Sequence, residues 1–294
     1  MSVFKIATAQ YDIGFFDTWQ DAKAKLTHWV DAAAKENAEL LVFPEYGSME
    51  LASLFGQDVY SDLHKQIEAM QSLLPDWYAL HIDLAKQFNV IILASSFPTQ
   101  IGEGQFVNRA SLFGPEGFIG FQDKLMMTRF ENEQWHISAG EQIQVFDTHL
   151  GRIGIHICYD SEFPMIAHQQ VAAGADLLLV PSCTDTEAGF HRVRIGCQAR
   201  ALENQCYVVQ SPTVGLAPWS EAVDINTGRG SVYTPVDYGF PDNGILAEGN
   251  PDHFGWVYAT VDLSQISRIR SQGQVFNYRD WRKQFIPKGP SQAS

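Results

Sequence analysis

Short apolar runs alternate with amphipathic segments along the first third of the chain. Residues 3–9 form an apolar run, and the segment after it repeats apolar residues at helical spacing to about residue 37. Further apolar runs at residues 40–43 and 90–94 enclose a second helical region at residues 61–89. This β-α-β-α-β order is typical of a sheet that packs helices against its face.

The middle of the chain departs from this alternation. Residues 107–113 and 118–121 flank Gly114-Pro-Glu-Gly117, which has the residues of a tight turn, so a hairpin is predicted. A mixture of hairpins and βαβ units favours one α/β domain, residues 1–270, in which two mixed sheets face each other. Alternation resumes with strands at 152–157, 176–180 and 206–210 and helices at 162–173 and 187–204.

Two segments in the last third of the chain differ from the regular alternation. Residues 211–255 are rich in Gly, Pro and aromatic residues, and we expect them to shape the mouth of a pocket. Residues 271–294 form a C-terminal tail that carries several aromatic side chains. Aromatic residues at a chain end favour docking, here onto a partner subunit.

Charge and cysteine content narrow the class of protein. The 294 residues include 20 Lys and Arg against 34 Asp and Glu, a formal net charge of -14. Such a chain repels phosphate backbones and anionic bilayers, so neither nucleic acid nor membrane is an expected partner. The four cysteines have no spacing typical of zinc, and neither a leader peptide nor a membrane-spanning run is recognisable. We therefore expect a cytoplasmic protein without a metal site.

A thiol stands where one of the predicted strands ends. The apolar run before Cys158 stops at that residue, and small and polar residues lead from it to Pro164 and a helix. A strand-to-helix corner is a common place for a nucleophile, because the strand end is rigid and the next turn offers free N–H groups. Cysteine is more often a small core residue, so this hypothesis needs partner residues.

Two charged residues follow other predicted strands. Glu45 comes after an apolar strand and Pro44, and Lys124 ends the hairpin. A carboxylate in a dry pocket can serve as a general base, and an ammonium group stabilises both a thiolate and an oxyanion. Each residue taken alone is more simply a surface charge. Their order with Cys158, each at a strand end, favours one shared site.

Three sequence blocks in this order resemble the nitrilase superfamily of carbon–nitrogen hydrolases over nearly the whole chain. The blocks are Phe43-Pro-Glu45, Asp123-Lys124-Leu125 and Cys158-Tyr-Asp-Ser-Glu-Phe-Pro164. The resemblance implies a four-layer α-β-β-α sandwich that forms homodimers or larger homo-oligomers and uses no cofactor. It also implies a second glutamate in the loop after the lysine. Glu133, seven residues before Gly140, occupies that place, with Glu131 as the alternative.

The resemblance implies hydrolysis of a small linear amide or carbamoyl compound through a cysteine thioester. Glu45 would take the proton of Cys158, and Lys124 and the backbone N–H of Tyr159 would hold the oxyanion. Glu133 would fix Lys124 and position the substrate. Three further residues are candidates for the substrate pocket, with Arg129 either binding a substrate carboxylate or remaining a surface charge: Trp135, Cys183 and Arg129.

Other functions stay open at this point. Tyr159-Asp160 resembles the amidase and carbamoylase branches, whereas nitrile-cleaving members usually have Trp-Glu after the cysteine. Nitrile hydrolysis and acyl transfer to an amine are the alternative reactions. A non-catalytic scaffold is disfavoured, because Glu45, Lys124 and Cys158 are all present.

Overall fold

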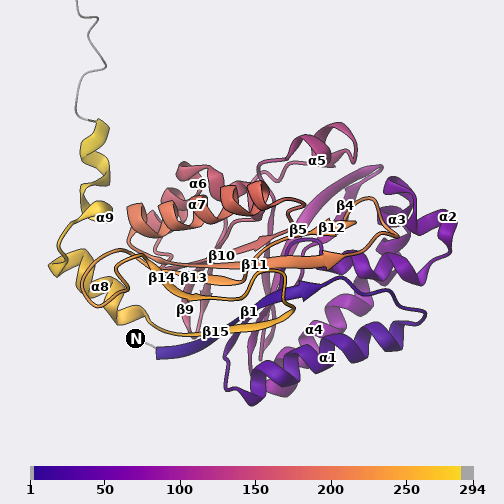
Figure 1. Ribbon diagram of the computed structural model, residues 1–294, viewed down its shortest axis with the longest axis horizontal. Helices are drawn as coiled ribbons and strands as arrows, with labels where there is room; N and C mark the ends of the chain where they lie inside the picture. Colours follow the sequence, from indigo (N-terminus) through magenta and orange to yellow (C-terminus); the bar gives the residue numbers. More distant parts are fainter. Residues whose placement is uncertain (1–2, 286–294) are drawn as a thin grey trace, which may run out of the picture.

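A computed structural model describes residues 3–285 as a mixed α/β fold in which two β-sheets lie between two layers of helices (Figure 1). Helices α6 and α7 cover one outer face, and α1 and α4 cover the opposite one. The four-layer sandwich predicted from the sequence is thereby confirmed. The helices are α1 (Trp19–Lys35), α2 (Gln57–Tyr60), α3 (Leu63–Met70), α4 (Leu74–Phe88), α5 (Arg129–Glu133), α6 (Pro164–Ala172), α7 (Glu187–Asn204), α8 (Leu263–Gln272) and α9 (Asn277–Asp280).

The first sheet has the N-terminal strand β1 next to its edge strand β15. Strand β1 pairs parallel with β2 and antiparallel with β15, and β2 continues through β3 to β5. Strand β5 also pairs with β4, β6 and the short β7. The bounds are β1 (Val3–Asp12), β2 (Leu40–Val42), β3 (Ile91–Leu93), β4 (Phe97–Gly102), β5 (Gln105–Gly114), β6 (Gly117–Asp123), β7 (Ile137–Ser138) and β15 (Gly255–Asp262).

The second sheet is built from the second half of the chain and joins the first at one end. Strands β9, β10 and β11 are parallel, β8 pairs with β9, and β13 and β14 extend the other edge. The ends of β1 and β11 pair at Tyr11↔Thr213 and Asp12↔Val214, which links the two sheets. The bounds are β8 (Val145–Thr148), β9 (Gly151–Ile155), β10 (Leu177–Ser182), β11 (Tyr207–Leu216), β12 (Ile225–Asn226), β13 (Ser231–Tyr233) and β14 (Ile245–Glu248).

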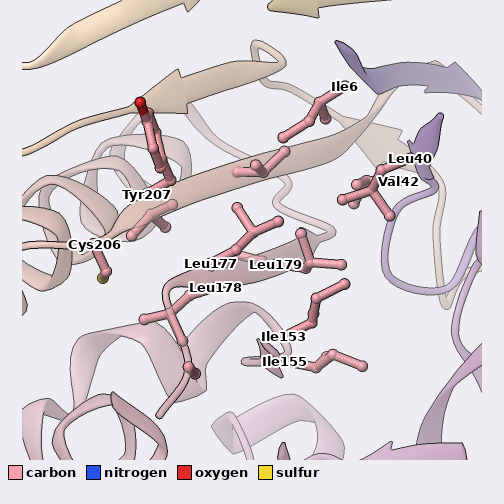
Figure 2. Packing of buried hydrophobic residues seen from close by; sticks show 14 of the residues in the cluster. Ile6, Leu40, Val42, Ile153, Ile155, Leu177, Leu178, Leu179, Cys206 and Tyr207 are labelled. Atoms are coloured by element: carbon pink, nitrogen blue, oxygen red, sulfur yellow. The ribbon is translucent and has the colours of Figure 1, made fainter. Parts of the chain in front are cut away.

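One apolar cluster holds the two sheets together. Ile6 and Val42 of the first sheet belong to the same buried cluster as Leu177 and Leu179 of the second (Figure 2). All four side chains are at most 1% exposed. Burying one such side chain contributes about 1.5–3 kcal/mol, so this interface fixes how the strand ends of the two sheets meet.

A capping residue and a proline determine where the outer helices α1 and α4 begin. Thr18 caps α1 by accepting a hydrogen bond from the Asp21 N–H, and Pro75 lies in the first turn of α4, where its missing N–H costs nothing. The part of the chain that the structure describes also has the 3-10 helices η1 (Gly47–Leu54), η2 (Gln71–Leu73), η3 (Cys158–Glu162) and η4 (Trp281–Phe285).

The C-terminal helices α8 and α9 lie at one end of the sandwich in Figure 1, and Leu263 and Ile266 of α8 are part of the buried core. The predicted boundary at residue 270 falls inside α8, and Trp281 stacks on His168 of α6 with ring centroids 4.3 Å apart. Docking of the tail on a partner subunit stays a prediction, and residues 286–294 of that tail lie outside the described residues. Within residues 3–285, no helix is both long enough and apolar enough to cross a bilayer.

Candidate active site

Three strand ends from both sheets deliver Glu45, Lys124 and Cys158 to one place. Glu45 follows β2, Lys124 follows β6, and Cys158 follows β9. Lys124 Nζ lies 2.7 Å from Glu45 Oε1, and the Cys158 side chain interacts with the same carboxyl group. The Cys158 thiol donates to the Cys183 carbonyl at 3.9 Å. The face-to-face packing of the sheets therefore brings together three residues that are spread over more than a hundred positions of the chain.

A second glutamate completes the environment of the lysine, and it is Glu131. Lys124 Nζ lies 2.6 Å from Glu131 Oε2, with all three side chains of the Glu45–Lys124–Glu131 group at most 3% exposed. Glu133 instead extends into solvent and pairs with the exposed Arg129 at 2.8 Å. The prediction that Glu133 contacts and fixes Lys124 is therefore wrong. The alternative residue, Glu131, makes this contact.

The short helix α5 explains why Glu131 points inward. Thr128 caps α5, and Glu131 Oε2 accepts hydrogen bonds from the Thr128 N–H at 3.0 Å and from Thr128 Oγ1 at 2.8 Å, forming a capping box. Tyr46, beside Glu45 in sequence, donates its hydroxyl to Glu131 Oε1 at 2.8 Å. These bonds fix Glu131 toward the interior and leave Glu133 on the opposite side of the single turn.

The backbone around the thiol is held in an unusual conformation. Cys158 has φ +51°, in the left-handed region that L-residues rarely adopt, and it opens η3. Asp160 Oδ2 accepts the Ile157 N–H at 3.0 Å, and Asp160 Oδ1 accepts the N–H groups of Leu125 and Met126 at 3.1 and 2.8 Å. One buried carboxyl group thus ties the loop of the thiol to the loop of Lys124.

Burial and neighbouring charges set the protonation of the two glutamates differently. Burial raises the pKa of Glu45, and the Glu131 charge adds to this against the opposing effect of Lys124. Burial also acts to raise the pKa of Glu131, but Lys124 and several hydrogen-bond donors bring it below the ordinary value. Glu131 is therefore the permanent counterion of Lys124, and Glu45 is the carboxyl group suited to exchanging a proton.

The thiol shares this environment. Burial and the Glu45 charge raise the pKa of Cys158 well above that of an ordinary thiol, so the resting sulfur is protonated. The pKa of Lys124 is well above its ordinary value, because Glu131 and Glu45 outweigh the effect of burial. A fixed ammonium next to a neutral thiol and a basic carboxylate is the arrangement that general-base activation of a nucleophile requires.

A cavity of about 640 Å³ opens onto these groups. The predicted pocket residues Trp135, Cys183 and Arg129 line it, as does Tyr159, and the Cys183 N–H donates to Glu45 Oε2 at 2.9 Å. The residues 221–225 also lie on its wall, within the region expected to shape the mouth. Within residues 3–285, no group of three or more His, Cys, Asp and Glu side chains could hold a metal ion.

Three site residues escaped the sequence analysis: Asn108, Tyr46 and Asp160. Asn108 is a fully buried polar residue of β5, and such a residue signals an inward polar contact once the strand register is known. Tyr46 adjoins Glu45 but looks like an ordinary loop position, and Asp160 stands out only as part of the block that resembles the amidase and carbamoylase branches. Their contacts depend on the distant loops that they meet.

Substituting Asp160 with asparagine is expected to destabilise the fold by an amount that depends on pH. Burial raises the pKa of Asp160 from 3.8 to about 7, although Lys124 and the three N–H donors oppose this. The stability that this group contributes is complete below the unfolded pKa and decreases as the pH rises through about 7. Urea unfolding should therefore show a larger loss for Asp160→Asn at pH 5 than at pH 8, and equal losses would contradict this account.

Comparison with known proteins now places the chain in a family. The carbon–nitrogen hydrolase profile matches residues 5–271, so the chain belongs to the carbon–nitrogen hydrolase family, and the resemblance to the nitrilase superfamily is confirmed.

Individual relatives cover the chain almost completely. It is 36% identical over 279 residues to the probable hydrolase YhcX of Bacillus subtilis (strain 168). The match covers 95% of this chain and 54% of that protein. Omega-amidase NIT2 of Homo sapiens is 25% identical over 289 residues, covering 95% of this chain and 96% of that protein. The chain thus spans about half the length of YhcX and nearly all of NIT2.

The fold is likewise that of a solved structure. The crystal structure of Saccharomyces cerevisiae Nit3, a member of branch 10 of the nitrilase superfamily, matches with a TM-score of 0.71 at 23% identity. The match covers 91% of this chain and 93% of that one, so the sandwich is shared over nearly its whole extent.

Proposed function

We propose that this protein hydrolyses a small linear amide or carbamoyl compound through a thioester on Cys158. The proposal rests on the buried contact of Lys124 with Glu45 and Glu131. These three residues and Cys158 line the same cavity. Membership of the carbon–nitrogen hydrolase family and the similarity to omega-amidase support the choice of bond.

The first half of the reaction forms the thioester. Glu45 takes the thiol proton while Sγ of Cys158 attacks the amide carbon, and the carbonyl oxygen becomes an oxyanion. Lys124 Nζ and the backbone N–H of Tyr159 stabilise that oxyanion. As the tetrahedral intermediate collapses, protonated Glu45 gives its proton to the departing nitrogen, and ammonia or an amine leaves.

The second half returns the enzyme to its starting state. Glu45 takes a proton from a water molecule, whose oxygen attacks the thioester carbon. Collapse of the second intermediate releases the carboxylic acid and the Cys158 sulfur, which recovers the proton from Glu45. Throughout, Glu131 keeps Lys124 charged and fixed, so the oxyanion donor needs no rearrangement during either half.

A matched panel of substrates tests this proposal. Amides, carbamoyl compounds and nitriles with the same short acyl chain are incubated with the enzyme, and ammonia release is measured. We expect turnover of an amide or carbamoyl compound and a thioester adduct on Cys158 by intact mass after acid quench. Release from the nitriles alone would overturn the amide assignment, and hydroxamate as the main product when hydroxylamine is added would favour acyl transfer.

The charges at the cavity mouth predict which end groups the substrate carries. Asp185, Glu221 and Asp224 line the cavity, whereas its two arginines already have acidic partners, Arg129 with Glu133 and Arg192 with Glu162. A negative mouth attracts cations and repels anions.

Amides that bear a distal ammonium group should therefore have kcat/KM values about ten-fold higher than equally long amides that bear a carboxylate. The difference should shrink as salt is raised from low concentration toward about 1 M, because exposed charges are screened. A preference for the carboxylate-bearing amides would instead mean that Arg129 or Arg192 leaves its partner to bind substrate.

A further inference from the structure

Asn108 is a fully buried asparagine of β5 that lies between the two glutamates of the site. Its Nδ2 is 2.9 Å from Glu45 Oε1 and 3.4 Å from Glu131 Oε1. Its backbone carbonyl accepts the Lys124 N–H at 2.9 Å, so the asparagine and the lysine are neighbours across the β5–β6 pair. The same strand register therefore positions the ammonium and the amide.

Lys124 and Asn108 form two parallel bridges between the carboxyl groups. Lys124 Nζ donates to Glu45 Oε1 at 2.7 Å and to Glu131 Oε2 at 2.6 Å. The two N–H groups of one amide nitrogen can serve one glutamate each, as the ammonium does. Two bridges hold the carboxyl groups at a set separation. Thr128 and Tyr46 already fix Glu131, so the amide acts mainly on Glu45, which otherwise accepts from Lys124 and the Cys183 N–H.

The orientation of the Asn108 amide is dictated by charge, and it leaves one atom unsatisfied. If the amide were reversed, its oxygen would face two carboxyl groups and would repel both. In the observed orientation Oδ1 is buried and has no hydrogen-bond partner among the described residues. An unpaired buried carbonyl is unfavourable because it has lost its hydrogen bonds to water, so the fold tolerates a penalty to keep an amide donor here.

We propose that Asn108 is a positioning residue that holds Glu45 against the Cys158 thiol by bridging it to Glu131. This inference rests on the proposed function only in that it takes Glu45 to be the base of Cys158. The bridge also favours the ionised form of Glu45, because Nδ2 donates to a carboxylate better than to a carboxylic acid. Without it, Glu45 becomes protonated at a higher pH, and Lys124 and the Cys183 N–H are the donors that remain to orient it.

Alkylation of Cys158 by iodoacetamide measures this effect without any substrate. The full-length protein and its Asn108→Leu variant are treated between pH 5 and pH 9, and the adduct on Cys158 is followed by peptide mass. We expect the acid limb of the rate profile to move up by about one pH unit in the variant, with a rate at pH 6 about ten-fold lower. With an amide substrate, kcat should fall by a similar factor while KM changes little.

Two companion variants separate positioning from mere support of the fold. Asn108→Asp retains the size of the side chain but replaces the donor with a third acidic group, and it should move the acid limb in the same direction. Asn204→Leu removes an equally buried asparagine whose amide donates to the Arg200 carbonyl in α7, and its profile should match the wild type.

The outcomes distinguish this inference from the proposed function. Folded Asn108 variants whose alkylation profiles coincide with those of the wild type and Asn204→Leu would overturn the positioning role. A displaced profile in a protein that hydrolyses no amide would leave the role of Asn108 standing and remove the proposed reaction.

Discussion

Replacing Cys158 with alanine is expected to lower amide turnover by on the order of 10⁴-fold or more, because no other group can form the covalent bond to the acyl carbon. The backbone should tolerate the change. Alanine has the same Cβ atom as cysteine, so the left-handed φ of +51° causes nearly the same backbone strain with either residue. The measurement is kcat/KM for the best amide of the panel, together with intact mass after acid quench.

A second cysteine provides the matched control. Cys197 lies in the middle of α7 and is fully buried in the apolar core. Cys197→Ala removes the same sulfur from a different place, so it should lower the free energy of unfolding without changing the covalent chemistry. The wild type and Cys197→Ala should both show an acyl adduct, and Cys158→Ala should show none. Turnover by Cys158→Ala above about a tenth of the wild-type rate would exclude a thioester mechanism.

Replacing Glu131 with glutamine is expected to reduce kcat/KM by about 10²- to 10³-fold, whereas Glu133→Gln should leave it unchanged. Glu131 accepts hydrogen bonds from Lys124, Thr128 and Tyr46 at once. In the Glu131→Gln variant, an amide NH₂ group would have to face some of these donors. The Lys124 ammonium would then keep one carboxylate partner and lose its fixed position beside the oxyanion.

The same pair of variants has distinct effects on stability. Removing one partner of a buried ion pair costs about 3–5 kcal/mol, so Glu131→Gln should unfold at a clearly lower urea concentration. Glu133 and Arg129 form an exposed pair that solvent screens, so Glu133→Gln should unfold as the wild type does. Equal losses of activity in the two variants would contradict the assignment of Glu131, and not Glu133, as the functional partner of Lys124.

The contrast between these two glutamates shows where sequence reasoning stops. Residues 131 and 133 are two positions apart, which is about 200° around a helix axis, so one of them faces inward when the other faces out. The spacing to Gly140 favours Glu133, but the capping box on Thr128 turns Glu131 inward. A helix of five residues carries no apolar periodicity that could have shown which side is buried.

The side-chain direction of Asn108, in a strand, likewise depends on the tertiary structure. In the sequence it is one of several polar residues within a predicted hairpin strand, and the direction of its side chain follows from pairing with β3, β4 and β6. A strand shifted by one residue would point it to the other face. Its contact with Glu45 crosses 63 positions of the chain and therefore exists only after the first sheet has formed.

The sequence by itself determined the alternation of strands and helices, the two facing sheets and three of the site residues. Each of Glu45, Lys124 and Cys158 adjoins a strand end, and local apolar patterns locate strand ends well. The tertiary structure decided which glutamate faces Lys124, which asparagine bridges the carboxyl groups and which charges surround the cavity mouth. Those outcomes depend on burial and on contacts between loops of different sheets, and such contacts are set by packing, not by the identity of neighbouring residues.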